Sequence, residues 1–414
     1  MRKNARRIRH GWRAAVAGVF LPVAMLVLVV EAAGRTPVGL WDATVVVDGV
    51  EIPFRFEIWR SGSAWRGAFF DGDLKVVSTG GRYESGGLVL RFDQYGSKVD
   101  VGYQADRLEG KYDRGTRGAA YPFKAVRAAP PTTRPGPVPP IGGEWRIPLE
   151  TGSSKGELAW RFIVRQSGAR VSAAIMRVDG DTGTLSGSFK DGTITLGHFA
   201  GAGPTVLEVT PLSDGSLQLL LDGRTRIKAF RVTDPRAKSV PDVTDPAKYT
   251  AVADPSAKFK FSFPDLNGKI VSDTDARFQG RVVIVSITGT WCPNCHDEAP
   301  FLSRLYKNYR QRGLEIVALS FEEPAQLKDL SRVRAFIRQY DITYPFLIAG
   351  EPEQAPQKLP QAVNLTTFPA TFLLGKDGRV RATRAGYASK ATGEFYEKEQ
   401  KQFLAEIDRL LAER

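Results

Sequence analysis

Cysteine, histidine and methionine are scarce in this chain of 414 residues. It contains two cysteines, three histidines and three methionines. Exported proteins that rely on structural disulfides carry several cysteines spread along the chain, and a structural zinc site takes about four Cys or His ligands. The composition therefore excludes a disulfide-stapled scaffold and predicts no metal site. Both cysteines lie in one hexapeptide, "WCPNCH", residues 291–296.

The chain also lacks a concentrated basic region beyond its first residues. Its formal net charge is +13, but the positive residues are dispersed and no basic run is interleaved with aromatic residues. Nucleic acid is therefore not an expected partner. An apolar fraction of 42% suffices for folded cores, and this length predicts more than one domain.

Long apolar runs are confined to the N-terminus. The first 13 residues carry six basic groups, and an apolar run at residues 14–30 and small residues at 32–34 follow. This order predicts a secretory signal at residues 1–34. An uncleaved anchor at residues 14–30 is the alternative. In both cases the rest of the chain is expected in the periplasm or another extracytoplasmic compartment, because the positive flank stays inside.

Two segments, residues 35–128 and 142–233, show strand-like alternation interrupted by Asp-Gly turns. Asp-Gly between apolar runs indicates β-hairpins. Between the two segments, residues 129–141 contain six prolines and predict an extended linker. We expect two all-β domains, each an antiparallel sandwich or an up-and-down barrel.

The two β segments resemble each other. Trp41 is matched by Trp145, and Phe123–Arg127 is matched by Ile227–Arg231, both at an offset of 104 residues. A constant offset at both ends predicts a tandem duplication; a single large β domain is the alternative. Neither segment shows a catalytic constellation.

After a second linker at residues 234–254, the pattern of residues 255–414 changes to alternating strands and helices, which predicts a parallel or mixed sheet. Residues 282–288 and 314–321 are apolar, β-branched runs typical of strands buried on both faces. Helices are expected at 296–312 and 332–340 and strands at 370–374 and 379–384, with Thr392 as the cap of a last helix.

The hexapeptide has two interpretations. CxxC is a redox dithiol motif, and CxxCH attaches a c-type haem. A haem site needs a second axial ligand, and outside the motif the chain after residue 34 offers only Met176 and His198. A buried strand that leads directly into the motif favours the dithiol, so no haem and no other cofactor is expected.

Three motifs occur in the order typical of one family. They are "FKFSFPDLNGKIVS" (259–272), "GRVVIVSITGTWCPNCHDEAPFLSRLYKNYRQRGLEIVALSF" (280–321) and "FPATFLLGKDGRV" (368–380). Residues 259–385 thereby resemble the TlpA/ResA-like thiol-disulfide oxidoreductases of the thioredoxin superfamily, which have redoxin or AhpC-TSA-like domains. The resemblance implies an α/β thioredoxin-like fold behind the two β domains.

The resemblance and the local geometry assign roles to the dithiol. At a strand-to-helix junction, unpaired N–H groups and the helix dipole stabilise a thiolate on Cys292, the expected nucleophile. Cys295 is the expected resolving thiol, and the two are expected to form a redox-active disulfide. Glu298, in the family pattern CxxCxxExP, is expected to exchange a proton with the dithiol.

Other motif residues are expected to surround the dithiol. The resemblance implies a cis peptide bond between Phe368 and Pro369, whose backbone pairs with a bound substrate. Trp291 and Pro293 are expected to belong to the same docking surface. His296 is interpreted as a solvated surface residue, with assistance to thiolate formation on Cys292 as the alternative.

The predicted function is reduction of disulfides in exported client proteins, with cytochrome c maturation as a candidate setting and a membrane-embedded protein as electron donor. Two alternatives stay open. One is a peroxiredoxin-like thiol peroxidase, although Gly289 stands where a peroxidatic site usually has Thr. The other is a binding protein whose β domains do the work while the redox domain is accessory.

Overall fold

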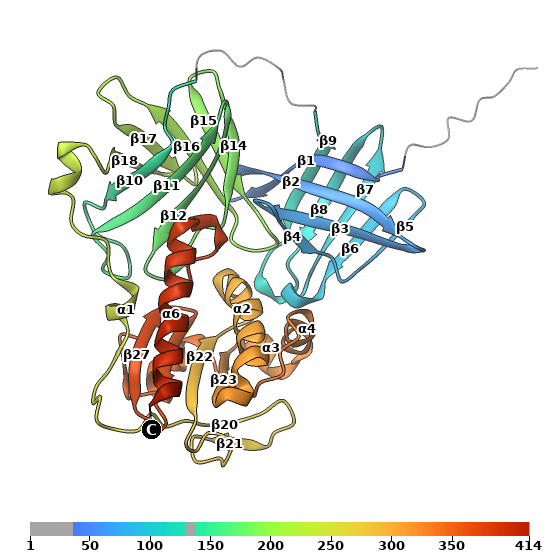
Figure 1. Ribbon diagram of the computed structural model, residues 1–414. Coiled ribbons are helices and arrows are strands. Elements are labelled where there is room, and N and C mark those ends of the chain that lie inside the picture. Colours follow the sequence, from blue (N-terminus) through green and yellow to red (C-terminus); the bar gives the residue numbers. More distant parts are fainter. Residues whose placement is uncertain (1–35, 130–137, 414) are drawn as a thin grey trace, which may run out of the picture. The chain divides into compact units, whose positions relative to one another are not determined.

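Residues 39–127 form one antiparallel sheet in the computed structural model, which describes residues 36–129 and 138–413 (Figure 1). The strand order is β4-β3-β2-β1-β9-β8-β7-β6-β5, and within the described residues no pairing joins the two edge strands. Asp48 and Gly49 both have positive φ and link the first two strands as a two-residue hairpin. The elements are β1 Gly39–Val47, β2 Val50–Ser61, β3 Ala64–Asp71, β4 Leu74–Val77, β5 Gly80–Glu84, β6 Gly87–Phe92, η1 Asp93–Tyr95, β7 Ser97–Gln104, β8 Arg107–Asp113, η2 Gly115–Arg117 and β9 Tyr121–Arg127.

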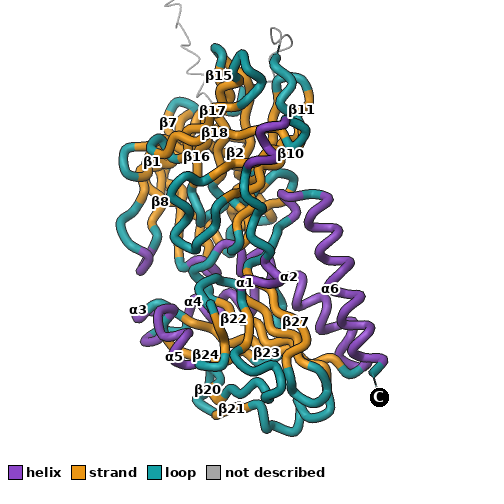
Figure 2. The backbone as a smooth tube through the Cα atoms, turned by 90° about the vertical axis from the view of Figure 1, so that its left-hand side faces the viewer, coloured by secondary structure: helices purple, strands orange, loops and turns teal. Residues whose placement is uncertain are grey.

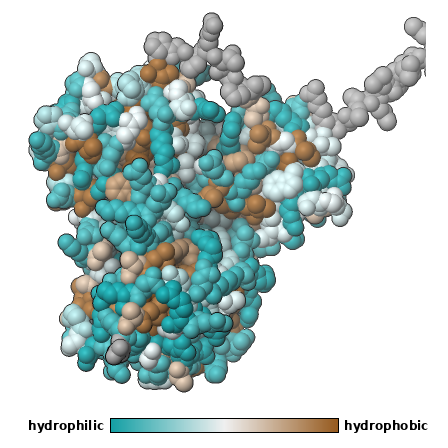
Figure 3. All heavy atoms as spheres, in the orientation of Figure 1, coloured by the Kyte–Doolittle hydropathy of each residue, from teal (hydrophilic) through white to brown (hydrophobic). Residues whose placement is uncertain are grey.

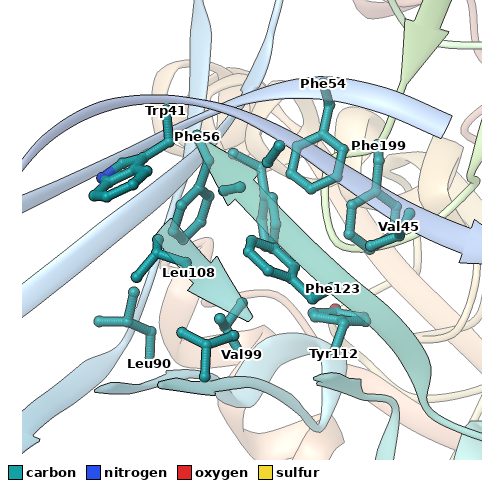
Figure 4. Close-up of a cluster of buried hydrophobic side chains, with 14 of the residues drawn as sticks. Trp41, Val45, Phe54, Phe56, Leu90, Val99, Leu108, Tyr112, Phe123 and Phe199 are labelled. Carbon is teal, nitrogen blue, oxygen red and sulfur yellow. The ribbon is translucent and has the colours of Figure 1, made fainter. Parts of the chain in front are cut away.

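The core of this first sheet is rich in aromatic rings (Figure 4). Strand alternation sends Phe54 and Phe56 to the inner face while their neighbours point outward. Phe199, from the second sheet domain, is fully buried in the same core. Its ring lies 5.0 Å from those of Phe54 and Tyr112. The two β domains therefore share apolar packing.

Residues 143–231 form a second antiparallel sheet that closes on itself. Its order is β11-β10-β18-β17-β16-β15-β14-β12-β13, and pairing of β11 with β12 completes a barrel. The prediction of two antiparallel all-β domains is thus confirmed, the first as an open half-barrel and the second as a closed barrel. The elements are β10 Gly143–Pro148, β11 Ala159–Ser167, β12 Arg170–Arg177, β13 Gly180–Asp181, β14 Leu185–Lys190, β15 Thr193–His198, β16 Thr205–Pro211, β17 Leu217–Leu221 and β18 Thr225–Arg231.

One structural corner occurs in both sheets at the predicted offset. The Trp41 indole donates to the carbonyl of Pro37, and the Trp145 indole donates to the carbonyl of Ile141. The guanidinium of Arg127 lies 4.2 Å from the Trp41 ring centre, and that of Arg231 lies 4.4 Å from the Trp145 ring centre. Equivalent cation–π and hydrogen-bonded partners support a tandem duplication.

The remaining chain builds a five-stranded mixed sheet in the order β24-β23-β22-β26-β27. Figure 2 shows strands of this sheet together with helices α2, α4 and α6. β22 pairs in parallel with β23 and antiparallel with β26. The elements are η3 Pro235–Ser239, α1 Pro246–Tyr249, β19 Ala251–Val252, β20 Ser262–Pro264, β21 Ile270–Ser272, β22 Val282–Thr288, α2 Pro293–Tyr309, η4 Arg310–Arg312, β23 Leu314–Phe321, α3 Pro324–Lys328, α4 Ser331–Gln339, β24 Phe346–Gly350, η5 Pro352–Gln354, α5 Ala355–Lys358, β25 Ala362–Val363, β26 Ala370–Leu374, β27 Val380–Ala385, η6 Lys390–Thr392 and α6 Glu394–Ala412.

The apolar run of β22 serves two cores at once. Val282 and Ile284 pack with side chains of α2, α4 and α6, whereas Val283 and Val285 pack with the entry segment around Phe259 and with α5. Both faces of the sheet are covered, so the strand needs apolar residues at every position. This explains why its sequence is continuous rather than alternating.

Several local expectations were wrong. The helix expected at 296–312 begins at Pro293 and ends at Tyr309, because Cys292 already acts as its N-cap. Thr392 does not cap the last helix; its hydroxyl donates to the carbonyl of Ser389, and Gly393 stands at the cap. The predicted linker 234–254 holds two short helices, each begun by an Asp cap before proline.

Residues 1–35, with the predicted signal or anchor, and residues 130–137 of the Pro-rich linker lie outside the described residues. Within the described part of the chain, no helix combines the length and the apolar character needed to cross a membrane. On the face seen in Figure 3, apolar groups are scattered among polar ones.

Replacement of Phe199 by Ala should destabilise the β domains. The cavity left in a fully buried aromatic core costs about 3–5 kcal/mol. Phe70→Ala, on a half-buried ring of the same first sheet, is the matched control and should cost clearly less. Urea unfolding followed by tryptophan fluorescence measures both. Equal losses in the two variants would contradict the shared core.

Candidate active site

Cys292 lies at the junction between β22 and α2. Its sulfur accepts the backbone N–H of Cys295 at 3.4 Å as the side-chain cap of the helix, and Pro293 follows at the first helical position. The thiol donates to the carbonyl of Phe368 at 3.2 Å. The nucleophile predicted from the sequence therefore sits at a helix N-terminus, where negative charge on sulfur is stabilised.

Cys295 lies one turn further and is 1% exposed. Burial, followed by the neighbouring Cys292, raises the pKa of its thiol well above the ordinary range. Both cysteines are thiols in this structure. The two sulfurs thus differ in environment, since only Cys292 lines the adjacent cavity.

The Phe368–Pro369 peptide bond is cis, as the family resemblance implied. The Trp291 ring lies 5.2 Å from the Phe368 ring, and its indole donates to the carbonyl of Phe321 at 2.9 Å. A Cβ on Gly289 would lie 2.4 Å from the indole nitrogen. The glycine at 289 is therefore required by the position of Trp291.

Glu298 is buried on the same helix, three residues after Cys295. Ser286 donates to one carboxyl oxygen at 3.0 Å and Thr371 to the other at 3.1 Å. Burial raises the pKa of Glu298 to about 7. A carboxyl that titrates near neutrality, three residues from Cys295, is suited to accept and return a proton.

Of the predicted site residues, Trp291, Cys292, Pro293 and Phe368 line one cavity of about 280 Å³. Cys295, Glu298 and Pro369 lie outside its lining. Asp297, which no sequence motif indicated, also lines this cavity. Burial and then Asp71 and Asp181 raise its pKa well above the usual range.

The interpretation of His296 as a solvated residue was wrong. Its ring is buried and stacks on Tyr95 of the first β domain at 4.0 Å. One ring nitrogen lies 2.8 Å from the Tyr340 hydroxyl and the other 2.9 Å from the Thr290 carbonyl. Burial lowers the pKa of His296 to about 3, so it stays neutral and supplies no positive charge to Cys292.

A buried charge network that the sequence did not reveal holds the loop before Cys292. Glu322 accepts both the backbone N–H of Thr290 at 2.9 Å and its hydroxyl at 2.6 Å. Arg332 donates to Thr290 at 2.8 Å and to Glu322 at 3.1 Å. Glu323 also accepts from Arg332, at 2.8 Å. The network fixes the turn that carries Trp291 and Cys292.

Replacement of Arg332 by Met should cost about 3–5 kcal/mol of stability, because Glu322 would stay buried without its counter-charge. Arg338→Met, on the exposed face of the same helix, is the control and should be nearly neutral. Chemical denaturation measures both. A small loss at Arg332 would show that the network contributes little.

The stability of the protein should depend on pH through Glu298. Its folded pKa of about 7 lies above the ordinary value of 4.5, so the folded state binds this proton more tightly. The stabilisation is complete below pH 4.5 and is lost as pH rises through 7. From about pH 5 to about pH 8, the wild type should lose about 3 kcal/mol more than Glu298→Gln. The free energy of unfolding of both proteins is measured across this pH range. An equal change with pH in the wild type and in Glu298→Gln would refute the prediction.

Comparisons with known proteins agree with this geometry. The AhpC/TSA family model matches residues 252–383. The thiol-disulfide oxidoreductase ResA of Bacillus thuringiensis subsp. konkukian is 33% identical over 136 residues, which cover 33% of this chain and 72% of that protein. ResA of Geobacillus kaustophilus is 34% identical over 141 residues, 34% of this chain and 74% of that protein.

A solved structure, a thiol:disulfide interchange protein of the thioredoxin family from Chlorobium tepidum TLS, is 25% identical. It covers 39% of this chain and 100% of its own, with a TM-score of 0.29; at that score the likeness carries no weight. The two ResA proteins, each matched over more than two thirds of its length, are decisive. The chain belongs to the ResA-like thiol-disulfide oxidoreductases of the thioredoxin superfamily.

Proposed function

We propose that this protein reduces disulfides of exported proteins with the Cys292–Cys295 pair. One observation carries the proposal: the Cys292 sulfur lies between the Cys295 N–H and the Phe368 carbonyl, with the Cys295 thiol buried behind it. A sulfur that borders a cavity can attack, while a buried second thiol is protected until the first has reacted.

The reaction proceeds in two exchanges. The Cys292 thiolate attacks one sulfur of a substrate disulfide, the substrate S–S bond breaks, and the departing sulfur takes up a proton. Cys295 then loses its proton and attacks the Cys292 sulfur in the mixed disulfide. The second substrate thiol leaves, and the Cys292–Cys295 disulfide forms, so two electrons pass from the protein to the substrate.

Glu298 is the proposed proton acceptor for Cys295. The buried thiol has a raised pKa and therefore needs a base for the second exchange. The Glu298 carboxyl has a pKa of about 7, so a substantial fraction is ionised near neutral pH. Ser286 and Thr371 hold both of its oxygens by hydrogen bonds, which orients the group within the core.

The docking surface proposed for the substrate consists of Trp291, Pro293, Phe368 and Pro369. The first three line the cavity beside Cys292. The Phe368 carbonyl, which belongs to the cis peptide bond, lies 3.2 Å from the Cys292 sulfur. Backbone groups at this place are suited to pair with an extended substrate segment.

The proposed setting is extracytoplasmic. It is supported by the basic residues and the apolar run of residues 1–34, with residues 14–30 as the anchor if the segment is retained. In an oxidising compartment the dithiol would be regenerated by a membrane-embedded electron donor protein. Apocytochrome c, whose haem-attachment thiols must be reduced, is a candidate client.

The contacts of His296 also support a protein that binds no haem. An axial histidine in a CxxCH site needs one ring nitrogen free for iron. Here both ring nitrogens have partners, the Tyr340 hydroxyl and the Thr290 carbonyl, and the ring lies between aromatic neighbours. Haem attachment would require one of these two contacts to break, whereas the dithiol interpretation leaves both in place.

Activity should depend on the two cysteines in different ways. With 2-hydroxyethyl disulfide as substrate, Cys292→Ser should be inactive, whereas Cys295→Ser should accumulate a covalent adduct visible by mass spectrometry. Glu298→Gln should slow turnover by about 100-fold. Full activity of Cys292→Ser would refute the proposal. Consumption of hydrogen peroxide faster than disulfide reduction would favour a peroxidase instead.

A reductant also needs a suitable potential. The reduction potential of the Cys292–Cys295 pair is therefore expected to lie below that of the glutathione couple, measured by equilibration in glutathione buffers. A value well above it would reverse the proposed direction of electron flow.

A further inference from the structure

Two connecting loops of the second β domain, the first of which includes the short strand β13, border the cavity beside the dithiol. Residues 178–184, "VDGDTGT", and residues 199–204, "FAGAGP", contribute to the lining of the cavity beside Cys292. Cys292 itself is only 4% exposed. The docking surface is therefore bordered by the β domain of the same chain rather than open on all sides.

The contact with the first of these loops is close and specific. The side-chain amide of Asn294, inside the CxxC motif, donates to the carbonyl of Asp179 at 2.8 Å. Gly180 forms a bridge with Tyr387 of the thioredoxin-like domain. A Cβ on Gly180 would lie 2.1 Å from the Asn294 amide nitrogen, and one on Gly386 would lie 2.2 Å from the Asp179 carbonyl carbon. Both glycines have positive φ, so the sequence provides for this approach.

A buried polar contact fastens the same loop. The Asp181 carboxylate accepts the backbone N–H of Ser389 at 2.5 Å and its hydroxyl at 3.0 Å. The carboxylate also accepts the N–H of Gly183 at 2.7 Å, which closes a local turn within the loop. Asp181 and Ser389 are both buried, and a buried charge with three donors is a built contact rather than a chance one.

The second loop and the first β domain complete the enclosure. A Cβ on Gly203 would lie 3.3 Å from the Pro293 ring. Tyr95 stacks on His296 directly after the dithiol. A Cβ on Gly201 would lie 3.3 Å from both Tyr95 and Tyr112, and the Tyr112 hydroxyl donates to the Gly201 carbonyl at 2.6 Å. Both β domains thus meet the first turn of α2.

We propose that residues 179–183 and 201–203 form a selectivity wall, which admits a disulfide carried on an extended, unfolded polypeptide segment and excludes one on the surface of a folded protein. The inference rests on the proposed disulfide reductase activity. The remaining cavity of about 280 Å³ holds a few side chains, whereas the convex surface of a folded protein cannot reach the Cys292 sulfur past the wall.

The test compares one disulfide on two carriers. Glutathione is joined by a mixed disulfide to the single cysteine of an unstructured Gly-Ser peptide, or to a single surface cysteine of folded ubiquitin, and 2-hydroxyethyl disulfide is the small reference. Release of glutathione by the full chain should be at least tenfold faster from the peptide than from ubiquitin. Equal rates from the two carriers would overturn the wall.

Loosening the wall should reduce this discrimination. In Asp181→Ala/Ser389→Ala, the ratio of the two rates should fall at least threefold. The matched control is Asp214→Ala/Ser216→Ala, because this Asp–Ser pair lies in a turn of the same barrel outside the cavity lining; its ratio should equal that of the wild type. Circular dichroism checks that the first variant is folded. If the folded variant keeps the wild-type ratio, this loop does not cause the discrimination and its proposed role is overturned.

Failure of the two proposals can be told apart. If the wild type reduces none of the three substrates, the proposed reductase function fails and the selectivity fails with it. If 2-hydroxyethyl disulfide is reduced but the peptide and ubiquitin carriers react equally, the function stands and the wall alone is refuted.

Discussion

The position of the Cys292 sulfur is the constraint on which the site depends. It requires a strand that ends in the core, a helix whose first N–H groups face the sulfur, and a backbone carbonyl supplied by a distant loop. The strand is held by two apolar cores, and the carbonyl belongs to Phe368, in the segment that leads into β26. Each of these elements is held in place by its own contacts, so the sulfur is positioned by rigid parts of the fold.

Burial of ionisable groups around this sulfur has two different outcomes. Glu298 and Asp297 have raised pKa values, because burial disfavours their charged forms. Glu322 instead has Arg332 and several hydrogen-bond donors around it, which is the arrangement a buried charge needs. The first pair is suited to moving protons near the thiols, whereas the second holds the loop in place.

The sequence revealed the parts of this site that are local. Cys292, Cys295 and Glu298 follow one another at three-residue spacing at the start of one helix, and the apolar run of residues 282–288 indicated a buried strand. The remote partners were not visible: the pairing of Arg332 with Glu322 and the stacking of Tyr95 on His296 join residues far apart in the chain. His296 was misjudged for the same reason, since a position next to a helix N-terminus says nothing about a domain that packs over it.

The two β domains share one structural corner but differ in the residues that their connecting segments contact. Trp41 with Arg127 and Trp145 with Arg231 keep the same corner, which belongs to the barrel itself. The two domains differ in what their connecting segments contact. Tyr95 of the first domain stacks on His296, whereas in the second domain Phe199 enters the core of the first and the Asp179 carbonyl accepts from Asn294, between the two cysteines. Connecting segments tolerate sequence change more readily than the strands that they join, and Phe199 shows that one of their side chains can also become part of a buried core. The contact between the second β domain and the redox motif is made by connecting segments of this kind. Its residues can therefore change while the strands of both domains stay the same.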